Sequence, residues 1–95
     1  MTSKQRAALK GAAMKMQPIF QIGKGSLTPE ITTAVAEALE ARELIKINVL
    51  KNCLDDTNVI AQTLAERTHS TLVQVIGKKI VLYKPAADPK DRKYE

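Results

Sequence analysis

The chain has 95 residues, of which 44% are hydrophobic and 26% charged, a composition that indicates one soluble globular domain and excludes wholesale disorder. With one Cys, one His, no Trp and only three aromatic residues, it cannot build an intramolecular disulfide, a structural zinc site or an extended stacking platform. Its apolar runs are too short to span a membrane and no secretory signal is recognisable, so the sequence predicts a cytoplasmic protein.

The net charge of +5 is unevenly distributed along the chain. Residues 1–29 contain five basic residues and no acidic residue, residues 30–66 contain three basic and seven acidic residues, and residues 67–95 contain seven basic and three acidic residues. Segregated positive charge is typical of a protein with a polyanionic partner, either nucleic acid or an anionic membrane surface. Charge that serves only solubility is the alternative.

The first predicted element is a helix that begins after Thr2 and ends before Pro18. Thr2 and Gln5 fit a capping box, and Pro18 pushes the residue before it out of the helical region. Small and apolar residues line one side of this helix, which predicts that it lies close to a sheet: Ala8, Leu9, Ala12, Ala13 and Met16.

The middle of the chain alternates between predicted strands and helices. Residues 18–22 predict a short strand, and Thr28 is expected to cap a second helix with Pro29 at its first position. Alternating apolar side chains predict a second strand over residues 43–50.

Acidic caps, a third helix and a hairpin complete the predicted elements. Asp55 and Asp56 precede the third helix, and residues 71–76 and 79–84 predict two strands joined by a turn at residues 77–78. One side of the third helix is expected to hold Val59, Ile60, Thr63, Leu64 and Arg67.

This order of elements predicts an α/β fold, α-β-α-β-α-β-β. Strand–helix–strand crossovers favour parallel pairing and the terminal hairpin must be antiparallel, so we expect a four-stranded mixed sheet with helices packed on it. Residues 1–84 are predicted to form this single domain, and residues 85–95 a flexible charged tail.

Nothing in the sequence favours catalysis. Cys53 and His69 lack flanking residues typical of a nucleophilic pair, and Asp55 and Asp56 are better explained as helix caps than as a carboxylate pair or metal ligands. We therefore predict a protein that is not an enzyme and that uses no metal, cofactor or small-molecule substrate.

The glycine-containing loop between the first strand and the second helix is the strongest candidate site. Gly23 and Gly25 would let a phosphate approach the backbone, with Gly25 expected at positive φ, and Lys24 adds a positive charge beside the N-terminus of a helix. Neither the dinucleotide fingerprint nor the nucleoside-triphosphate loop fits, because Thr28 replaces a required glycine in the first and Gly25 a required hydroxyl in the second. A tight turn without a ligand is the alternative.

Three segments carry a resemblance to a known family: "LKGAAMKMQPIFQIGKGSLT", "ELIKINVL" and "LVQVIGKKIVLYK". They resemble the CRM domain of chloroplast RNA splicing and ribosome maturation proteins, and in particular its free-standing bacterial YhbY-type members. The resemblance implies a fold similar to the C-terminal domain of translation initiation factor three, binding to ribosomal RNA in large-subunit precursors, and no catalysis. The family's GxxG loop maps onto residues 23–26, where Ser26 replaces the last glycine.

We therefore predict a monomeric RNA-binding protein that assists ribosome assembly. Because aromatic residues are scarce, recognition of the RNA backbone and shape is expected. The candidate RNA-binding residues are Lys4, Arg6, Lys10, Lys15, Gly23, Lys24, Gly25, Ser26, Thr28, Lys78 and Lys79.

Two other classes of function are compatible with the sequence. A protein–protein adaptor would use the acidic face of the second helix, formed by Glu30, Glu37 and Glu40. A membrane-surface protein would use the first helix, but the apolar side of that helix lacks large anchoring residues.

Overall fold

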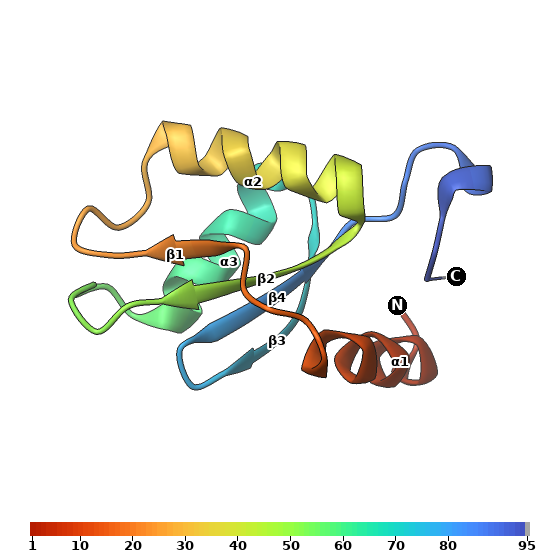
Figure 1. Ribbon diagram of the computed structural model, residues 1–95, viewed down its shortest axis with the longest axis horizontal. Coiled ribbons are helices and arrows are strands. Elements are labelled where there is room, and N and C mark those ends of the chain that lie inside the picture. The colour runs from red at the N-terminus through yellow and green to blue at the C-terminus, as the bar shows by residue number, and fades with distance from the viewer. Residues whose placement is uncertain (95) are drawn as a thin grey trace.

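The computed structural model describes residues 1–94 and confirms the predicted fold class and order of elements (Figure 1). The helices and strands are α1 (Ser3–Met14), β1 (Phe20–Ile22), α2 (Pro29–Arg42), β2 (Leu44–Val49), α3 (Thr57–Thr68), β3 (Thr71–Ile76), β4 (Lys79–Tyr83) and the short 3₁₀ helix η1 (Pro89–Asp91).

The predicted caps and turns set where these elements begin and end. Thr2 and Thr28 accept hydrogen bonds from Gln5 N and Ile31 N at the starts of α1 and α2. Asp56 caps α3, and Gly77 takes a φ of 57° in the turn between β3 and β4. Short polar side chains and a glycine with positive φ are the chemistry that such caps and hairpin turns require.

The four strands form one mixed sheet in the order β1-β2-β4-β3. β1 pairs with β2 in parallel, while β4 is antiparallel to both β2 and β3. The crossover through α2 joins the parallel pair, as a right-handed strand–helix–strand unit does.

The two faces of the sheet have separate hydrophobic cores. Ile45, Ile47 and Val49 point to the face that α2 and α3 cover. Leu44 points to the opposite face, where it packs with Leu9 and other residues beneath α1. Helices on both faces thus exclude water from the strands, but α1 covers only part of its face (Figure 1).

Two predicted helix faces are rotated in the structure. In α1, Ala8 is exposed, and Leu9 and Ala13 are the buried residues. In α3, Val59 is 60% exposed and Arg67 is also exposed, while Ala61 and Thr68 are buried. Ile60 and Leu64 are buried as predicted, so the buried side of α3 is shifted toward Ala61 and Thr68 and away from Val59 and Arg67.

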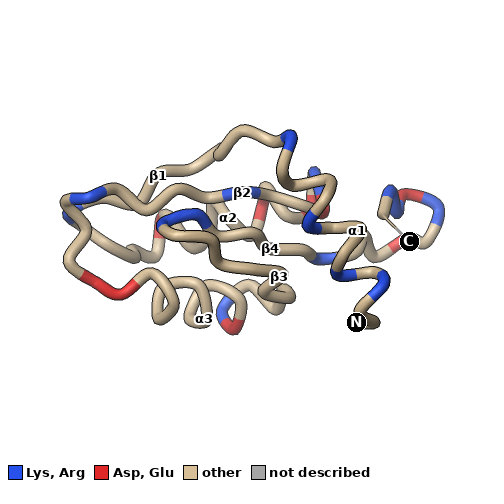
Figure 2. The backbone as a smooth tube through the Cα atoms, turned by 90° about the horizontal axis from the view of Figure 1, so that it is seen from below, with Lys and Arg blue, Asp and Glu red and all other residues tan. Residues whose placement is uncertain are grey.

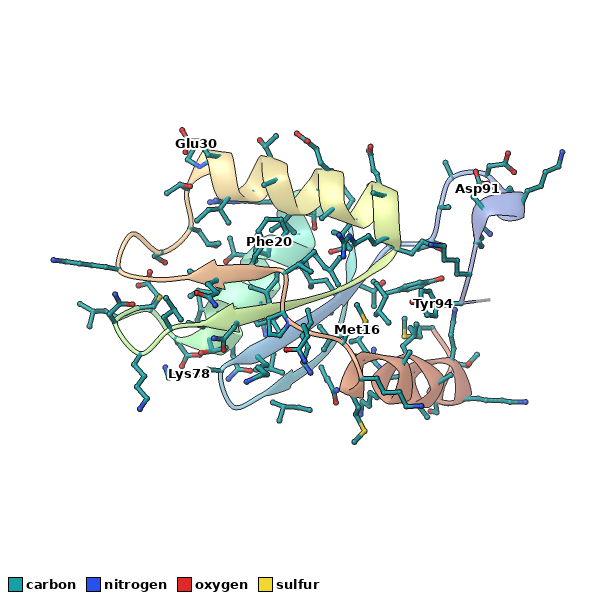
Figure 3. The ribbon with its side chains drawn as sticks, viewed as in Figure 1. Met16, Phe20, Glu30, Lys78, Asp91 and Tyr94 are labelled. Atoms are coloured by element: carbon teal, nitrogen blue, oxygen red, sulfur yellow. The ribbon has the colours of Figure 1, made fainter. Side chains whose placement is uncertain are left out.

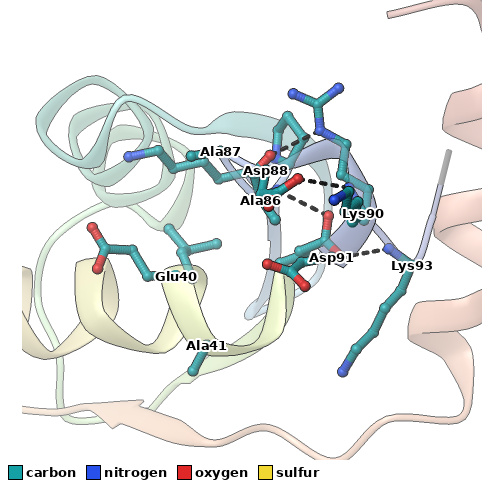
Figure 4. A pocket seen from close by; sticks show the side chains of 13 residues that line it. Glu40, Ala41, Ala86, Ala87, Asp88, Lys90, Asp91 and Lys93 are labelled. Atoms are coloured by element: carbon teal, nitrogen blue, oxygen red, sulfur yellow. Dashed lines mark hydrogen bonds between the residues drawn. The ribbon is translucent and has the colours of Figure 1, made fainter.

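The C-terminal segment, residues 85–94, lies against the end of α2 (Figure 4). Glu43 is 2% exposed, and its two carboxylate oxygens accept hydrogen bonds from Ala86 N at 3.0 Å and Lys93 N at 2.6 Å. The rings of Tyr83 and Tyr94 meet edge to face, 6.3 Å apart. The mobility expected for residues 85–95 stays a prediction, and Glu95 lies outside the described residues.

Candidate nucleic-acid interface

Three loops meet at one end of the sheet, because β1 and β2 are parallel and both end there. Leu50 N donates to Ile22 O at 2.8 Å, which joins the end of β1 to the start of the loop after β2. Val49 N donates to Lys78 O at 2.7 Å, which joins the hairpin turn to the same end. We call this end, formed by residues 23–28, 50–56 and 77–79, the loop end; it lies at the left in Figure 1.

The turn at residues 23–26 differs from the expectation for Gly25. Ser26 N donates to Gly23 O at 2.9 Å and closes the turn, and Ser26 adopts a φ of 53°. Gly25 is outside the left-handed region, so the predicted positive φ is wrong for Gly25 and is found instead at the next residue, Ser26. A Cβ added at Gly25 would meet nothing within 4 Å, which leaves its backbone open to a ligand.

Gly23 instead serves contact between two loops. A Cβ at Gly23 would lie 3.2 Å from Asn52 Oδ1 and 3.4 Å from Leu50 Cδ1. The absence of a side chain therefore lets the loop after β2 pack closely on the loop after β1.

The loop end is basic. Lys24, Lys78 and Lys79 are exposed there as predicted candidates, and Lys51 joins them from the loop after β2 (Figure 2). Sequence reasoning missed Lys51, because only the parallel pairing of β1 and β2 brings it beside residues 23–26. Within the loop end, Asp55 and Asp56 lie toward the start of α3, where Asp56 caps the helix.

The start of α2 offers fewer free amides than expected. Pro29 has no N–H, and Ile31 N is bonded to the Thr28 hydroxyl oxygen at 3.2 Å. Glu30 adds a negative charge in the first turn. Because Ser26 N is also bonded, to Gly23 O, the backbone of residues 24–25 and the lysines of the loop end are better placed to meet a phosphate than the helix N-terminus is.

The basic residues of α1 lie away from the loop end, in the other half of the molecule, whose longest axis measures 38 Å (Figure 1). Lys4, Lys10 and Lys15 are exposed. Arg6 is half-buried, and its Nη1 donates to the backbone oxygens of Leu72 and Val73 in β3. The structure thus gives two basic regions, and it ties Arg6 into the packing of α1.

Cys53 and His69, the two residues considered as a nucleophilic pair, occupy positions that the fold itself explains. Cys53 is buried in the core beneath α2 and α3, and His69 ends α3 with a φ of 55°. Within residues 1–94, no cluster of three or more His, Cys, Asp or Glu side chains could hold a metal ion. No helix in the same part of the chain is long and apolar enough to cross a membrane.

An α/β domain with helices on both sheet faces, a basic loop end and a second basic region on α1 defines a class of small proteins suited to bind a polyanion. Within that class, the family model of the CRS1 / YhbY (CRM) domain matches residues 1–84. The chain therefore belongs to the CRS1 / YhbY (CRM) domain family, as the resemblance indicated.

Relatives of known sequence and structure agree with this assignment. The chain is 48% identical over 90 residues to Probable RNA-binding protein YqeI of Bacillus subtilis, covering 95% of this chain and 94% of the relative. It is 31% identical to an RNA-binding protein of Haemophilus influenzae over 95% of this chain and 91% of that protein. The solution structure of hypothetical protein SAV1595 from Staphylococcus aureus superposes with a TM-score of 0.80 at 43% identity, covering 100% of this chain and 99% of that one.

Proposed function

We propose that this protein binds RNA without catalysing a reaction, and that its target is ribosomal RNA in precursors of the large ribosomal subunit. The observation that carries the proposal is the convergence at the loop end of four exposed lysines, held there by backbone hydrogen bonds between strand ends and loops: Lys24, Lys51, Lys78 and Lys79. The names of the relatives support RNA as the partner. The ribosomal target follows from the family resemblance.

Binding at the loop end is electrostatic in origin. Lysine ammonium groups neutralise phosphates and release condensed counterions, which accounts for most of the affinity of such sites. The open backbone at Gly25 lets a phosphate approach closer than a side chain would allow. Lys4, Lys10 and Lys15 on α1 form a second region of phosphate contact for an RNA long enough to reach it.

Charge-matched variants test the proposal. The loop-end variant Lys24→Gln, Lys51→Gln, Lys78→Gln removes three positive charges, and the control Arg67→Gln, Lys90→Gln, Lys93→Gln removes three elsewhere. In fluorescence anisotropy at matched salt, we expect the loop-end variant to lose about tenfold or more in RNA affinity and the control to lose little. Equal losses in the two variants would contradict the placement of the site.

Crosslinking in cells, followed by sequencing of the bound RNA, tests the ribosomal target. Enrichment of large-subunit ribosomal RNA is the expected result, with the protein acting as a cytoplasmic monomer. Absence of RNA binding at low salt would favour the adaptor alternative. That alternative would use exposed Glu30, Glu37 and Glu40 on α2, beside a shallow hollow that Pro29, Thr33 and Ala34 help to line.

A further inference from the structure

Four side chains form a row across the part of the sheet that α1 leaves uncovered. Gln21 pairs with Asn48, Asn48 with Lys79, and Lys79 with Ile76, so one residue comes from each strand. Paired residues share a face, and Asn48 follows the buried Ile47, so the row points away from α2 and α3. We call Gln21, Asn48, Lys79 and Ile76 the cross-strand row.

The side chains of the row are accessible to solvent, and its amides are available for hydrogen bonding to a ligand. Gln21 and Lys79 are exposed, Asn48 is half-exposed, and Ile76 is 57% exposed. Within residues 1–94, neither the Gln21 nor the Asn48 side-chain amide has a hydrogen-bond partner. Each amide offers two donors and an acceptor, the groups that bond to the edges of bases.

No aromatic ring competes for this role. Phe20 packs against the core beneath α2, Tyr83 is buried, and Tyr94 contacts Tyr83 (Figure 3). Base stacking on aromatic side chains, which many RNA-binding sheets use, is therefore not available on this face. Hydrogen bonding by the two amides, with the apolar surface of Ile76 beside them, is what the row can offer.

The row lies between the two basic regions. On one side, the row meets the loop end, because Lys79 belongs to both. On the other side, Lys46, two residues before Asn48 on the same strand face, donates through Nζ to Ala13 O at 3.2 Å and Met16 O at 3.4 Å. These carbonyls belong to the C-terminal end of α1, where Lys15 is the capping residue. A strand that contacts both basic regions along the shortest path over this face would cross the row.

We propose that the cross-strand row reads unpaired bases of single-stranded RNA, whose backbone runs from the loop end across the sheet to the end of α1. This inference rests on the proposed RNA binding and adds the class of substrate. Unpaired bases present their edges to side chains, whereas the bases of an A-form duplex are withdrawn in its narrow major groove. The row therefore favours single-stranded over duplex RNA.

The test compares two pairs of amide substitutions on two RNAs. Gln21→Ala with Asn48→Ala removes the amides of the row, and Asn58→Ala with Gln62→Ala removes two exposed amides from α3, beyond the other face of the sheet. Each protein is titrated by anisotropy with an unstructured RNA of about 16 nucleotides and with a hairpin duplex of the same composition. Circular dichroism establishes folding, and Gln21→Ala alone replaces the double variant if the latter does not fold.

We expect the row variant to lose about tenfold in affinity for the single-stranded RNA, the value of two hydrogen bonds. Its affinity for the duplex, and the dependence of its RNA affinity on salt concentration, should equal those of the control variant, since no charge changes. Equal single-strand affinity of row variant and control would overturn the inference, and so would an equal loss on both RNAs. If instead no protein, unaltered or variant, binds either RNA, the proposed function itself is wrong.

Discussion

Ser26 has a left-handed backbone at the position where the GxxG pattern of the family has its last glycine. This conformation costs a side-chain-bearing residue about 1–2 kcal/mol, because Cβ crowds the following carbonyl oxygen. The hydrogen bond from Ser26 N to Gly23 O holds the residue there. The serine at this position therefore stores strain in the turn.

Relief of that strain is the first prediction. Ser26→Gly should raise the free energy of unfolding by about 0.5–1 kcal/mol, because the greater freedom of glycine in the unfolded chain offsets part of the gain. Urea denaturation measures this change. Gly25→Ala, which needs no left-handed backbone and meets nothing within 4 Å, is the neighbouring control and should not lower stability. An unchanged midpoint for Ser26→Gly would mean that the turn is unstrained.

The second prediction concerns access to the backbone at Gly25. Since the added side chain would stand in open space, Gly25→Val should change the free energy of unfolding by less than about 0.5 kcal/mol. The 1–3 kcal/mol cost of a strained backbone does not apply there. RNA affinity should nevertheless fall, because the branched side chain blocks the close approach of a phosphate. A folded Gly25→Val protein with unchanged affinity in anisotropy would show that the loop is only a turn.

At the scale of elements, α1 is held on the sheet by two long cationic side chains that reach backbone carbonyls. Arg6 bonds to β3 where the pairing with β4 shifts register between Leu72 and Gln74. Lys46 bonds from β2 to the last turn of α1 and beyond, where the helix dipole is negative. Some basic residues, such as Arg6 and Lys46, thus hold α1 on the sheet, whereas others, such as Lys10, are exposed on the surface.

The third prediction separates these two roles. Arg6→Gln should lower the free energy of unfolding by about 1–3 kcal/mol, since carbonyl oxygens at the irregular part of β3 lose a charged donor. Lys10→Gln, on the exposed side of the same helix, should change it by less than about 0.5 kcal/mol. Both are measured by urea denaturation. If the two variants are equally stable, Arg6 does not stabilise the packing of α1 and acts only as a surface charge, like Lys10.

The C-terminal segment gives the fourth prediction. Deletion of residues 86–95 should destabilise the domain by about 1–3 kcal/mol, because the buried Glu43 carboxylate loses the amides of Ala86 and Lys93. RNA affinity should change little, because the segment lies beside the end of α2 and outside the loop end. The same deletion made in a Glu43→Ala background should cost less, and additive effects of the two changes would contradict the coupling.

Sequence reasoning succeeded where the signal is local. Caps at Thr2, Thr28 and Asp56, the turn at Gly77 and the alternation in β2 each depend on a few neighbouring residues, and the structure confirms all of them. Features that depend on tertiary contact were missed. Strand pairing places Lys51 at the loop end, and the packing of α1 on the sheet brings the Arg6 side chain to carbonyls of β3. Glu43 is buried because the C-terminal segment folds back and donates backbone amides to its carboxylate.

At the scale of the whole molecule, whose longest axis measures 38 Å, the positive charge forms two regions, one at the loop end and one along α1 in the other half of the molecule (Figure 2). A ligand that engages both must run along the molecule, whereas a short one can occupy only one region. The number of phosphates contacted, and hence the dependence of affinity on salt, should therefore increase with the length of the RNA.

This length dependence is the fifth prediction. With single-stranded RNA of about 16 nucleotides, log affinity should fall with log salt at a slope of roughly −3 to −5, which corresponds to about four to six phosphate contacts. With about 4 nucleotides the slope should be markedly shallower, because only the loop end is engaged. Anisotropy titrations at several salt concentrations measure both slopes.

Charge reversal on α1 tests the same prediction. The double variant Lys10→Glu, Lys15→Glu should lower the affinity for the longer RNA strongly and leave the affinity for the shorter RNA nearly unchanged. Equal slopes for the two lengths, or equal sensitivity of both to the α1 reversals, would show that the two basic regions do not bind one strand.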